Sequence, residues 1–348
     1  MRLFITGGCG FIGSNFILNQ GIKKADALLN YDKLSYSGNI NNLSSIENNN
    51  IYSFIQGDIC DINTLNKAII DFEPDIIIHF AAESHVDRSI DSPFDFVDTN
   101  IVGTANLLYA ASSYMKKTAK LMKFIHISTD EVYGSLKKTG FFNENSLIKP
   151  NSPYAASKAS SDLLVRSWNK TYNFPSIVTH CSNNYGPFQF PEKLIPLMIA
   201  NCIDNKPLPL YGNGKNIRDW LHVYDHCEAI SQIILNGKIG EVYDIGGGTE
   251  KSNIEIVTKI CKILDELRPR SKKSSYKDLI TFVEDRPGHD FRYAISSLKI
   301  QNELNWKPAE SFETGIYKTV KWYLENESWW RKIQDINYKQ ERLGLKNI

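Results

Sequence analysis

The chain has 348 residues, 42% hydrophobic and 23% charged, which is the composition of an ordinary globular protein with a large core. Forty lysines and arginines balance 39 aspartates and glutamates, and a net charge of +1 gives no global field that would attract nucleic acid. The longest apolar runs, such as residues 76–78, are too short to cross a bilayer, so we expect no membrane-spanning segment.

In the first half of the chain, apolar strands alternate with helical segments. Short apolar runs predict strands, and apolar residues at helical spacing predict helices between them. The expected strands are residues 2–6, 28–32, 51–55, 75–80 and 123–128, and the expected helices are 11–18, 61–72 and 100–114. Asp61 is the expected N-cap of the second helix. This alternation predicts an α/β fold with a Rossmann-type doubly wound parallel sheet, in which ligands bind at the carboxyl ends of the strands.

The pattern loosens after residue 183, where prolines are frequent. One more core strand is expected at 241–245, and helices are expected at 253–267 and 311–330. We therefore expect a large Rossmann domain over residues 1–182, to which 216–248 returns. A smaller, mixed C-terminal domain would consist of 183–215 and 249–348.

A glycine-rich turn follows the first expected strand. Gly7, Gly10 and Gly13 permit a tight turn, close approach of a pyrophosphate, and tight packing of the next helix, whose N-terminus favours phosphate. Asp32 ends the second strand, where a carboxylate binds ribose hydroxyls and repels a 2′-phosphate. The motif predicts NAD as the cofactor, with Asp58 within reach of the adenine. The alternative interpretation of Asp32 is a simple turn residue.

Tyr154 and Lys158 are four residues apart, so on a helix both would lie on one face. A nearby ammonium lowers the pKa of a phenol, and we expect Lys158 to make Tyr154 a base near neutral pH. Lys158 could also hydrogen-bond the nicotinamide ribose. Such a pair is common by chance, and only its position after the strand ending in Thr129 makes it informative.

Two adjacent carboxyl groups, Asp130 and Glu131, follow Thr129 at the end of that strand. Adjacent acidic residues are usually solvated surface. Inside a closed site they repel each other, which raises at least one pKa, so that one is protonated while the other is ionised. Elimination of water requires such an acid and base, whereas simple epimerases and dehydrogenases of this fold do not.

The glycine turn, Thr129, Tyr154 and Lys158 together resemble the extended short-chain dehydrogenase/reductase family. The Thr-Asp-Glu sequence resembles the dTDP-glucose 4,6-dehydratases within it, and the likeness extends over nearly the whole chain. The other matching motifs are residues 81–89, 181–187, 190–196 and 285–290.

The resemblance implies a lyase of deoxysugar biosynthesis that dehydrates dTDP-glucose to dTDP-4-keto-6-deoxyglucose. The steps are C4 oxidation, C5/C6 elimination of water and C6 reduction by the same, recycled NAD. It implies that Thr129 binds the substrate hydroxyl, Tyr154 is the first base and Lys158 orients the cofactor. Glu131 would remove the C5 proton, and Asp130 would protonate the departing 6-hydroxyl.

The resemblance also implies the remaining site residues. Those expected at the cofactor are Gly7, Gly10, Phe11, Ile12, Gly13, Asp32, Lys33, Leu34, Ser35, Asp58, Ile59, Ala81, Ala82, Ser84, Thr99, Tyr154, Lys158 and Asn184. Those expected at the substrate are Ser84, Thr129, Asn183, Glu192, Lys193, Leu194, Pro209, Tyr211, Arg218, Asn253, Asp285, Arg286 and His289. Arg218 and Arg286 would approach the diphosphate. For Arg218 the alternative is a surface ion pair with Asp219, and for Asn253 it is a helix cap.

Several expectations concern the protein's setting. Six cysteines without a Cys-x-x-Cys pair favour reduced thiols in the cytoplasm. His85 and His289 have no metal-ligand spacing with a Cys or carboxylate cluster, so we expect no metal. The resemblance implies a homodimer. Cys9 and His180 are unusual for the family, and we expect neither to alter function.

Two alternatives to the dehydratase remain. A UDP-hexose 4-epimerase or another nucleotide-sugar enzyme would share the glycine turn, Tyr154 and Lys158, without needing the carboxyl pair. An inactive dinucleotide-binding regulator would need no catalytic residues, yet Thr129, Asp130 and Glu131 are intact. Selectivity between dTDP and UDP rests on the resemblance alone.

Overall fold

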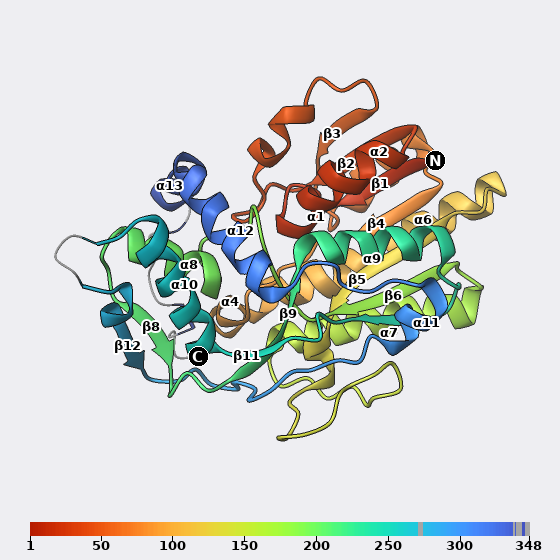
Figure 1. The fold of residues 1–348 in the computed structure, drawn as a ribbon. Coiled ribbons are helices and arrows are strands. Elements are labelled where there is room, and N and C mark those ends of the chain that lie inside the picture. The colour runs from red at the N-terminus through yellow and green to blue at the C-terminus, as the bar shows by residue number, and fades with distance from the viewer. Residues whose placement is uncertain (271–273, 337, 339–342, 345–348) are drawn as a thin grey trace.

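The computed structural model describes residues 1–270, 274–336, 338 and 343–344. Figure 1 shows a large sheet with helices on both faces and, beside it, a smaller group of elements that includes α8, α10, β8 and β12. The strands are β1 (Arg2–Thr6), β2 (Ala27–Asp32), β3 (Tyr52–Gln56), β4 (Ile76–His79), β5 (Lys123–Thr129), β6 (Ser176–Cys181), β7 (Asn183–Tyr185), β8 (Leu208–Tyr211), β9 (Ile217–His222), β10 (Val242–Ile245), β11 (Glu250–Ser252) and β12 (Ile280–Val283).

The helices connect these strands. The α-helices are α1 (Phe11–Phe16), α2 (Ile22–Lys24), α3 (Ile62–Phe72), α4 (Val86–Asp91), α5 (Pro93–Phe96), α6 (Thr104–Thr118), α7 (Pro153–Tyr172), α8 (Leu194–Ile203), α9 (Val223–Asn236), α10 (Asn253–Leu267), α11 (Leu298–Leu304), α12 (Phe312–Glu325) and α13 (Glu327–Ile336). Two π-helical segments, η1 (Ile17–Gly21) and η3 (Val97–Gly103), continue neighbouring α-helices, and η2 (Ile40–Ile46), η4 (Asp130–Tyr133) and η5 (Tyr276–Leu279) are 3-10 turns.

The large sheet has seven parallel strands in the order β10-β6-β5-β4-β1-β2-β3, which confirms the predicted Rossmann-type fold. Strand β1 lies between β2 and β4, so the strand order reverses beside it. Ligands of such sheets bind outside the carboxyl ends of the strands at this reversal. The glycine turn after β1 and the carboxyl pair after β5 therefore open onto the same edge.

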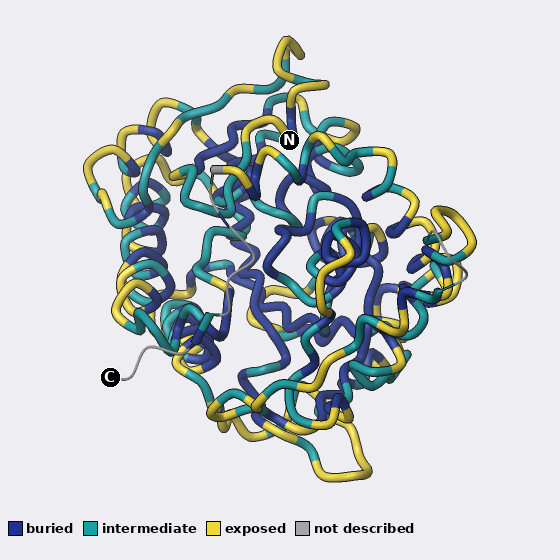
Figure 2. Tube along the Cα trace, turned by 90° about the vertical axis from the view of Figure 1, so that its left-hand side faces the viewer, coloured by how far each residue is buried: buried dark blue, intermediate teal, exposed yellow. Residues whose placement is uncertain are grey.

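The sheet is buried on both faces because its strands are apolar at successive positions. In β1, Leu3 and Ile5 join one hydrophobic cluster and Phe4 joins the cluster on the opposite face. In β4, Ile77 likewise belongs to a different cluster from its neighbours on either side. Figure 2 shows buried chain through the middle of the molecule and exposed residues on the outer loops.

The smaller part has its own core, in which α8, α10 and α12 pack together around residues such as Ile199, Ile260 and Ile316. It contains the two-stranded sheet β12-β8. A separate three-stranded sheet, β11-β9-β7, is formed by strands that alternate along the chain with those of the other two sheets. Strand β10 belongs to the large sheet and α9 packs on α1, whereas β9 pairs with β7 and β11. The expected domain boundaries stay a prediction, and their final residues, 345–348, lie outside the described part of the chain.

Some predicted elements differ at their ends. The first helix continues through η1 to Lys24, and the helix expected at 100–114 reaches Thr118 and is preceded by the π-helical residues 97–103. The helix expected at 311–330 is two helices, because Asn326 leaves the helical conformation between α12 and α13. Asp61 caps α3 as predicted, with its carboxylate accepting from the amides of Asn63 and Thr64.

Candidate active site

The glycine turn after β1 is shaped by close contacts that exclude side chains. Gly7 has φ +71°, and a Cβ on it would overlap the backbone of Ala81 at the end of β4. A Cβ on Gly13 would overlap the carbonyl oxygen of Gly7. Beside Gly10 a Cβ would approach only that same carbonyl, at 3.3 Å, so this glycine leaves open space for a ligand. The turn thus has the close-packed cradle that a dinucleotide pyrophosphate requires.

Asp32 is buried at the end of β2, where it fixes this turn. Its carboxylate accepts hydrogen bonds from the backbone amides of Cys9 and Leu34, each at 2.8 Å. Burial raises the pKa of Asp32, and the two amide hydrogen bonds oppose that shift. Leu34 has φ +57°, so Asp32 also stabilises a tight turn, as the alternative interpretation suggested. The two roles are compatible, because Asp32 also lines the cavity next to the glycines.

A cavity of about 280 Å³ runs along this edge of the sheet. Every residue expected at the cofactor lines it except Leu34, whose backbone instead bonds Asp32. The cradle of glycines, the buried carboxylate and Asp58 at one end fit a dinucleotide. The sequence had not indicated several further lining residues, namely Tyr31, Ser37, Gly38, Gly57, Phe80, Glu83, Ile127, Ser128, Cys181, Ser182, Gln189 and Phe190.

A second cavity, of about 260 Å³, lies between the large sheet and the smaller part. The residues expected at the substrate line it, except Thr129, which lines the first cavity, and Asp285, which lines neither but accepts a hydrogen bond from His289 at 2.6 Å. Five residues line both cavities: Ser84, Glu131, Asn183, Glu192 and Lys193. The two cavities therefore meet at Glu131.

The carboxyl pair lies on the 3-10 turn η4, which begins directly after β5. The Thr129 hydroxyl accepts from the amide of Glu131 at 3.3 Å and caps this turn. Asp130 is 1% exposed, and its Oδ2 has no hydrogen-bond partner among the described residues. An unpartnered buried carboxyl group is costly in free energy, so it marks a position where a ligand or a proton is expected.

The two carboxyl groups differ in their electrostatic surroundings. Burial raises the pKa of Asp130 far above its ordinary value, and the charges of Glu131 and Asp219 add to the shift. Burial also raises the pKa of Glu131, but Arg286, Arg218 and Lys193 oppose it. Asp130 is therefore the group that holds a proton, and Glu131 is the one more easily ionised.

Tyr154 and Lys158 lie on α7, which Ser152 caps and Pro153 begins. The Lys158 ammonium donates to the carbonyl oxygen of Ile127 at 2.9 Å, and burial lowers its pKa to about 8. Burial raises the pKa of Tyr154 well above its ordinary value, and the charge of Glu131 raises it further. A hydrogen bond with Thr129 lowers it only in part. The expectation that Tyr154 is a base near neutral pH is therefore wrong for the protein alone.

Two buried arginines line the second cavity. Arg218 is 6% exposed, donates to the carbonyl oxygens of Ile217 and Asp290 at 2.8 and 3.0 Å, and stacks on Tyr293. Asp219 is turned away and accepts from the amides of Gly247 and Thr249. The alternative of a surface ion pair between Arg218 and Asp219 is therefore wrong.

Arg286 pairs with Asp87 at 2.6 Å, and its Nε has no hydrogen-bond partner among the described residues. Tyr211 donates to the same Asp87 carboxylate at 2.9 Å. The second cavity thus contains a guanidinium, that of Arg286, which Asp87 orients and which still has an N–H donor left for a ligand. Such a guanidinium is suited to a diphosphate.

Comparison with known proteins identifies the family. The family model described as GDP-mannose 4,6 dehydratase matches residues 4–319. A dTDP-glucose 4,6-dehydratase of Neisseria meningitidis is 52% identical over 99% of both chains. The chain belongs to the 4,6-dehydratase family of extended short-chain dehydrogenases/reductases.

Solved structures agree with this assignment to the dehydratase family. The chain is similar to the dTDP-glucose 4,6-dehydratase of Bacillus anthracis in complex with NAD, with a TM-score of 0.85 and 46% identity over 96% of this chain and 99% of that one. It is also similar to the UDP-glucose 4-epimerase of Thermus thermophilus, with a TM-score of 0.83 and 25% identity over 94% of this chain and 100% of that one. The epimerase shares the fold at about half the identity.

Other residues expected at the substrate of this dehydratase-family chain have structural partners of their own. Lys193 precedes α8 and donates to the carbonyl oxygen of Ser84 at 2.8 Å. Glu192 is buried and pairs with Arg88 at 2.7 Å. Asn253 lines the second cavity as the first residue of α10, but Ser252 and Glu255 form the capping box of that helix. The helix-cap alternative for Asn253 is therefore wrong.

Sequence reasoning missed several residues that line the second cavity. They are His85, Val86, Asp87, Leu197, Met198, Asn201, Leu210, Trp220, Val283, Tyr293, Tyr338 and Leu343. Asp87 lies inside the motif at 81–89, so its charge within a matching segment was a usable signal. The apolar residues gave no such signal. Leu197 and Met198 on α8, for example, follow a pattern that is equally typical of an ordinary hydrophobic core.

Proposed function

We propose that this chain dehydrates dTDP-glucose to dTDP-4-keto-6-deoxyglucose, as a hydro-lyase that recycles one NAD. The observation that carries the proposal is the carboxyl pair, of which Asp130 lines the first cavity and Glu131 lines both cavities. Relatives named dTDP-glucose 4,6-dehydratase match essentially the full length, and one with a solved structure binds NAD. An epimerase needs no acid and base at this point.

The residues along the first cavity would hold the cofactor. The amides of the glycine turn and the N-terminus of α1 would hold the pyrophosphate, Asp32 the adenosine ribose, and Lys158 the nicotinamide ribose. When bound, NAD would supply the hydride chemistry of the reaction, as the acceptor for C4 of the sugar and the donor to C6.

Tyr154 removes the proton of the sugar 4-hydroxyl in the first step. Because burial keeps the pKa of Tyr154 high, its phenolate needs added positive charge in the complex. The Lys158 ammonium, whose pKa is about 8, remains mostly protonated at neutral pH and provides part of that charge. Thr129 contributes by hydrogen bonding to the same site.

The carboxyl pair carries out the elimination. The ketone at C4 makes the C5 hydrogen acidic, and Glu131 removes it as a proton. Asp130, which holds a proton because its pKa is raised, donates it to the departing 6-hydroxyl, so that C6–O breaks and water forms. After hydride reaches C6, Glu131 returns its proton to C5. The sum is the loss of one water from the substrate.

Arg218, Arg286 and Lys193 would bind the diphosphate of the substrate. The chain has a net charge of +1, so this local group must supply the attraction. Pro209, Tyr211 and Asn253 line the second cavity but not the first, and would flank the base and deoxyribose.

The proposal is tested by incubating the purified chain with dTDP-glucose and measuring the absorbance of a 4-keto sugar after alkali. UDP-glucose in parallel tests the base. Formation of dTDP-galactose without any 4-keto product would instead identify a 4-epimerase, and no conversion of either sugar would overturn both assignments.

We also propose that the protein is a cytoplasmic homodimer. All six cysteines are free thiols, which suits a reducing compartment. No helix in the described residues is long and apolar enough to span a bilayer.

The dimer is supported by helices α6 and α7, which pack together and expose large apolar residues, including Tyr109 at 60% and Leu163 at 51%. Sedimentation equilibrium at micromolar concentration tests the dimer, and a monomer mass would contradict it.

A further inference from the structure

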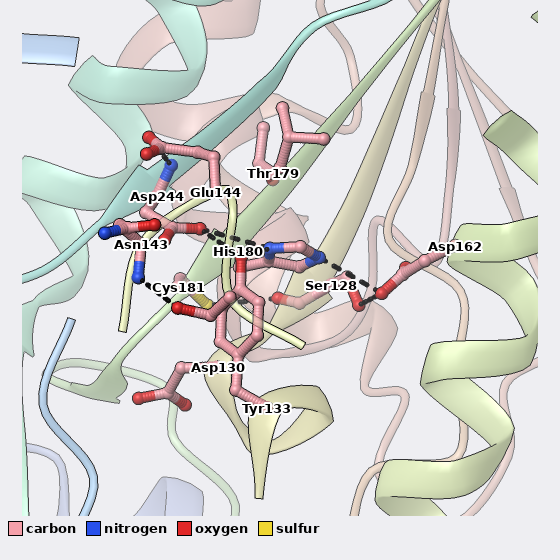
Figure 3. A network of polar contacts seen from close by, with 12 residues as sticks. Ser128, Asp130, Tyr133, Asn143, Glu144, Asp162, Thr179, His180, Cys181 and Asp244 are labelled. Carbon is pink, nitrogen blue, oxygen red and sulfur yellow. Dashed lines mark hydrogen bonds and ion pairs between the residues drawn. The ribbon is translucent and has the colours of Figure 1, made fainter. Parts of the chain in front are cut away.

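A buried polar network lies next to the 3-10 turn η4, which carries Asp130 and Glu131 and is called the catalytic turn below, as Figure 3 shows. At its centre is His180 on β6, which is only 4% exposed. The network draws on β5, η4, α7 and β10 through Ser128, Tyr133, Asp162 and Asp244. None of these residues has a role in the proposed reaction steps, and His180 is one of the two residues that are unusual for the family.

The imidazole ring of His180 has a carboxylate on each side. Its Nδ1 lies 3.1 Å from Oδ1 of Asp244 and 2.7 Å from the hydroxyl of Tyr133. Its Nε2 lies 3.1 Å from Oδ2 of Asp162. Tyr133 in turn donates its hydroxyl proton to Asp244 at 3.0 Å. Both ring nitrogens of His180 are therefore fully engaged within the protein.

This arrangement fixes the protonation state of the ring. A neutral imidazole has one N–H and one lone pair, so one of its nitrogens would face a carboxylate with a lone pair. Two carboxylates on opposite sides require both nitrogens to donate, which makes His180 an imidazolium. Burial lowers the pKa of His180, but the hydrogen bonds to Asp162 and Asp244 outweigh it and raise the pKa to about 10.

The other titratable groups around the ring do not change this balance. His126 on β5 lies 3.2 Å from Oδ1 of Asp162, and burial lowers its pKa to about 4, so it is neutral. Glu144 accepts from the backbone amide of Asp244 at 3.1 Å, and burial raises its pKa. Lys158 is close enough to lower the pKa of His126. One cation thus stands between the carboxylates of Asp162 and Asp244.

The network holds the catalytic turn at both of its ends. Ser128, immediately before Thr129, donates its hydroxyl to Oδ2 of Asp162 at 3.0 Å. Tyr133, the last residue of the turn, contacts His180 and Asp244. The ring of Tyr133 also stacks on Phe142 at 5.2 Å. Between these anchors lie Asp130 and Glu131, which make no such bonds to the network.

We propose that the His180 imidazolium is a positioning residue, which ties Tyr133 and Ser128 together through Asp162 and Asp244 and so holds Asp130 and Glu131 at the cavity junction. The kinetic consequence rests on the proposed dehydratase function, whereas the charge state and the order of the turn do not. Misplacement of a catalytic group by about 1 Å can reduce the rate about a hundredfold.

The charge state is tested first, on the unaltered protein. ¹⁵N-histidine labelling gives resonances for the seven histidines, and loss of one pair in His180→Asn assigns those of His180. We expect both ring nitrogens of His180 to remain protonated at pH 8, where an unpaired imidazole is neutral. A neutral ring at pH 8 would overturn the proposal, whether or not the chain dehydrates dTDP-glucose.

The positioning role is tested with substitutions. His180→Leu removes both donors, and we expect a tenfold to hundredfold lower kcat with a KM for dTDP-glucose within about twofold of the original. His180→Asn, which keeps one donor, should lie between. Tyr133→Phe should lower kcat less, because the ion pairs of His180 remain. Amide hydrogen exchange at residues 128–133 should accelerate in the same order.

His222→Asn is the matched control, since His222 is also a buried histidine and Asn preserves its role as the N-cap of α9. We expect its kcat to equal that of the original. Unchanged kcat and unchanged exchange in a folded His180→Leu would overturn the proposal. If His180→Leu does not fold, the His180→Asn and Tyr133→Phe variants and the ¹⁵N measurement decide it. If the original chain lacks dehydratase activity, the hydrogen-exchange and ¹⁵N measurements still decide whether the proposal holds.

Discussion

Two pairs of buried carboxyl groups lie next to each other near the carboxyl end of β5, and they are in opposite electrostatic states. Asp162 and Asp244 share the His180 imidazolium, and hydrogen bonds from the histidines lower the pKa of Asp162 against the effect of burial. Asp130 and Glu131 have no bound cation at hydrogen-bonding distance among the described residues, and burial raises the pKa of both. The residue type and the burial are similar, so the partners decide the charge.

The difference shows how one sheet edge provides both rigidity and reactivity. A carboxylate that accepts hydrogen bonds from a cation stays ionised and holds its donors in place, because a proton would break those bonds. A buried carboxyl group without such a cation can hold a proton and exchange it with a ligand. Asp244 is also one of the charges that raise the pKa of Asp130, so the paired carboxylates influence the unpaired ones.

The largest effect should come from removing the ionisable group at Glu131. Glu131→Gln keeps the size of the side chain but cannot take up the C5 proton, and general bases contribute about 10²–10⁴-fold to rate. We expect kcat to fall about 10³-fold while NAD remains bound. Because C4 oxidation does not need Glu131, NADH absorbance should accumulate on mixing with dTDP-glucose. Glu303→Gln, at a residue far along the chain on α11, is the control, and near-normal turnover of Glu131→Gln would contradict its role.

Asp130→Asn should have the next largest effect, about 10²-fold in kcat. Since the pKa of Asp130 is raised, its proton is present at neutral pH and is lost as pH rises through that pKa. The original protein should therefore lose activity on the alkaline side through this group. The residual activity of Asp130→Asn should lack that limb, which a pH profile of kcat measures. An unchanged alkaline limb would assign the acid elsewhere.

Arg286→Leu should act on binding rather than on chemistry. Hydrogen bonds to charged groups contribute about 1.5–3 kcal/mol, so KM for dTDP-glucose should rise roughly tenfold to a hundredfold with kcat changed little. Arg286→Lys retains the charge opposite Asp87 and should lie between. A fall in kcat with constant KM would instead place Arg286 at the reacting carbons.

Much of this arrangement could be predicted from sequence, because its signals are local. The glycine turn follows an apolar strand, Asp32 ends the next strand, and the adjacent Asp130 and Glu131 need only β5 to be placed. The family resemblance then supplied Arg218 and Arg286, which lie far along the chain. The expectation that Lys158 makes Tyr154 a base near neutral pH was wrong for the protein alone, because burial and the nearby Glu131 raise the pKa of Tyr154 and neither effect can be read from spacing.

The His180 network could not be predicted, for a related reason. Strand β6 reads Ser-Ile-Val-Thr-His-Cys, and it is not among the strands expected from the sequence. All six residues are nevertheless buried, since Thr179 bonds the His126 carbonyl and His180 bonds partners on α7 and β10. Polar residues can occupy a sheet interior when distant parts of the chain satisfy them, and only the fold brings those parts together.

The pH dependence of stability should also separate paired from unpaired groups. The pKa of His180 is raised from about 6.5 to about 10, so its stabilising contribution is complete below pH 6.5 and is lost as pH rises towards 10. The difference in unfolding free energy between the original protein and His180→Leu should therefore shrink over this range.

His222 behaves oppositely, because burial lowers its pKa to about 4. Between about pH 4 and 6.5 its ring takes up a proton in the unfolded chain but not in the folded protein, which lowers the stability of the folded protein. The difference between the original and His222→Asn should therefore grow in favour of the original as pH rises from about 4 to 6.5. Urea unfolding of the three proteins across these two pH ranges measures both trends. If the difference in unfolding free energy between the original protein and His180→Leu stays constant from pH 6.5 to about 10, the ring of His180 carries no charge in the folded protein.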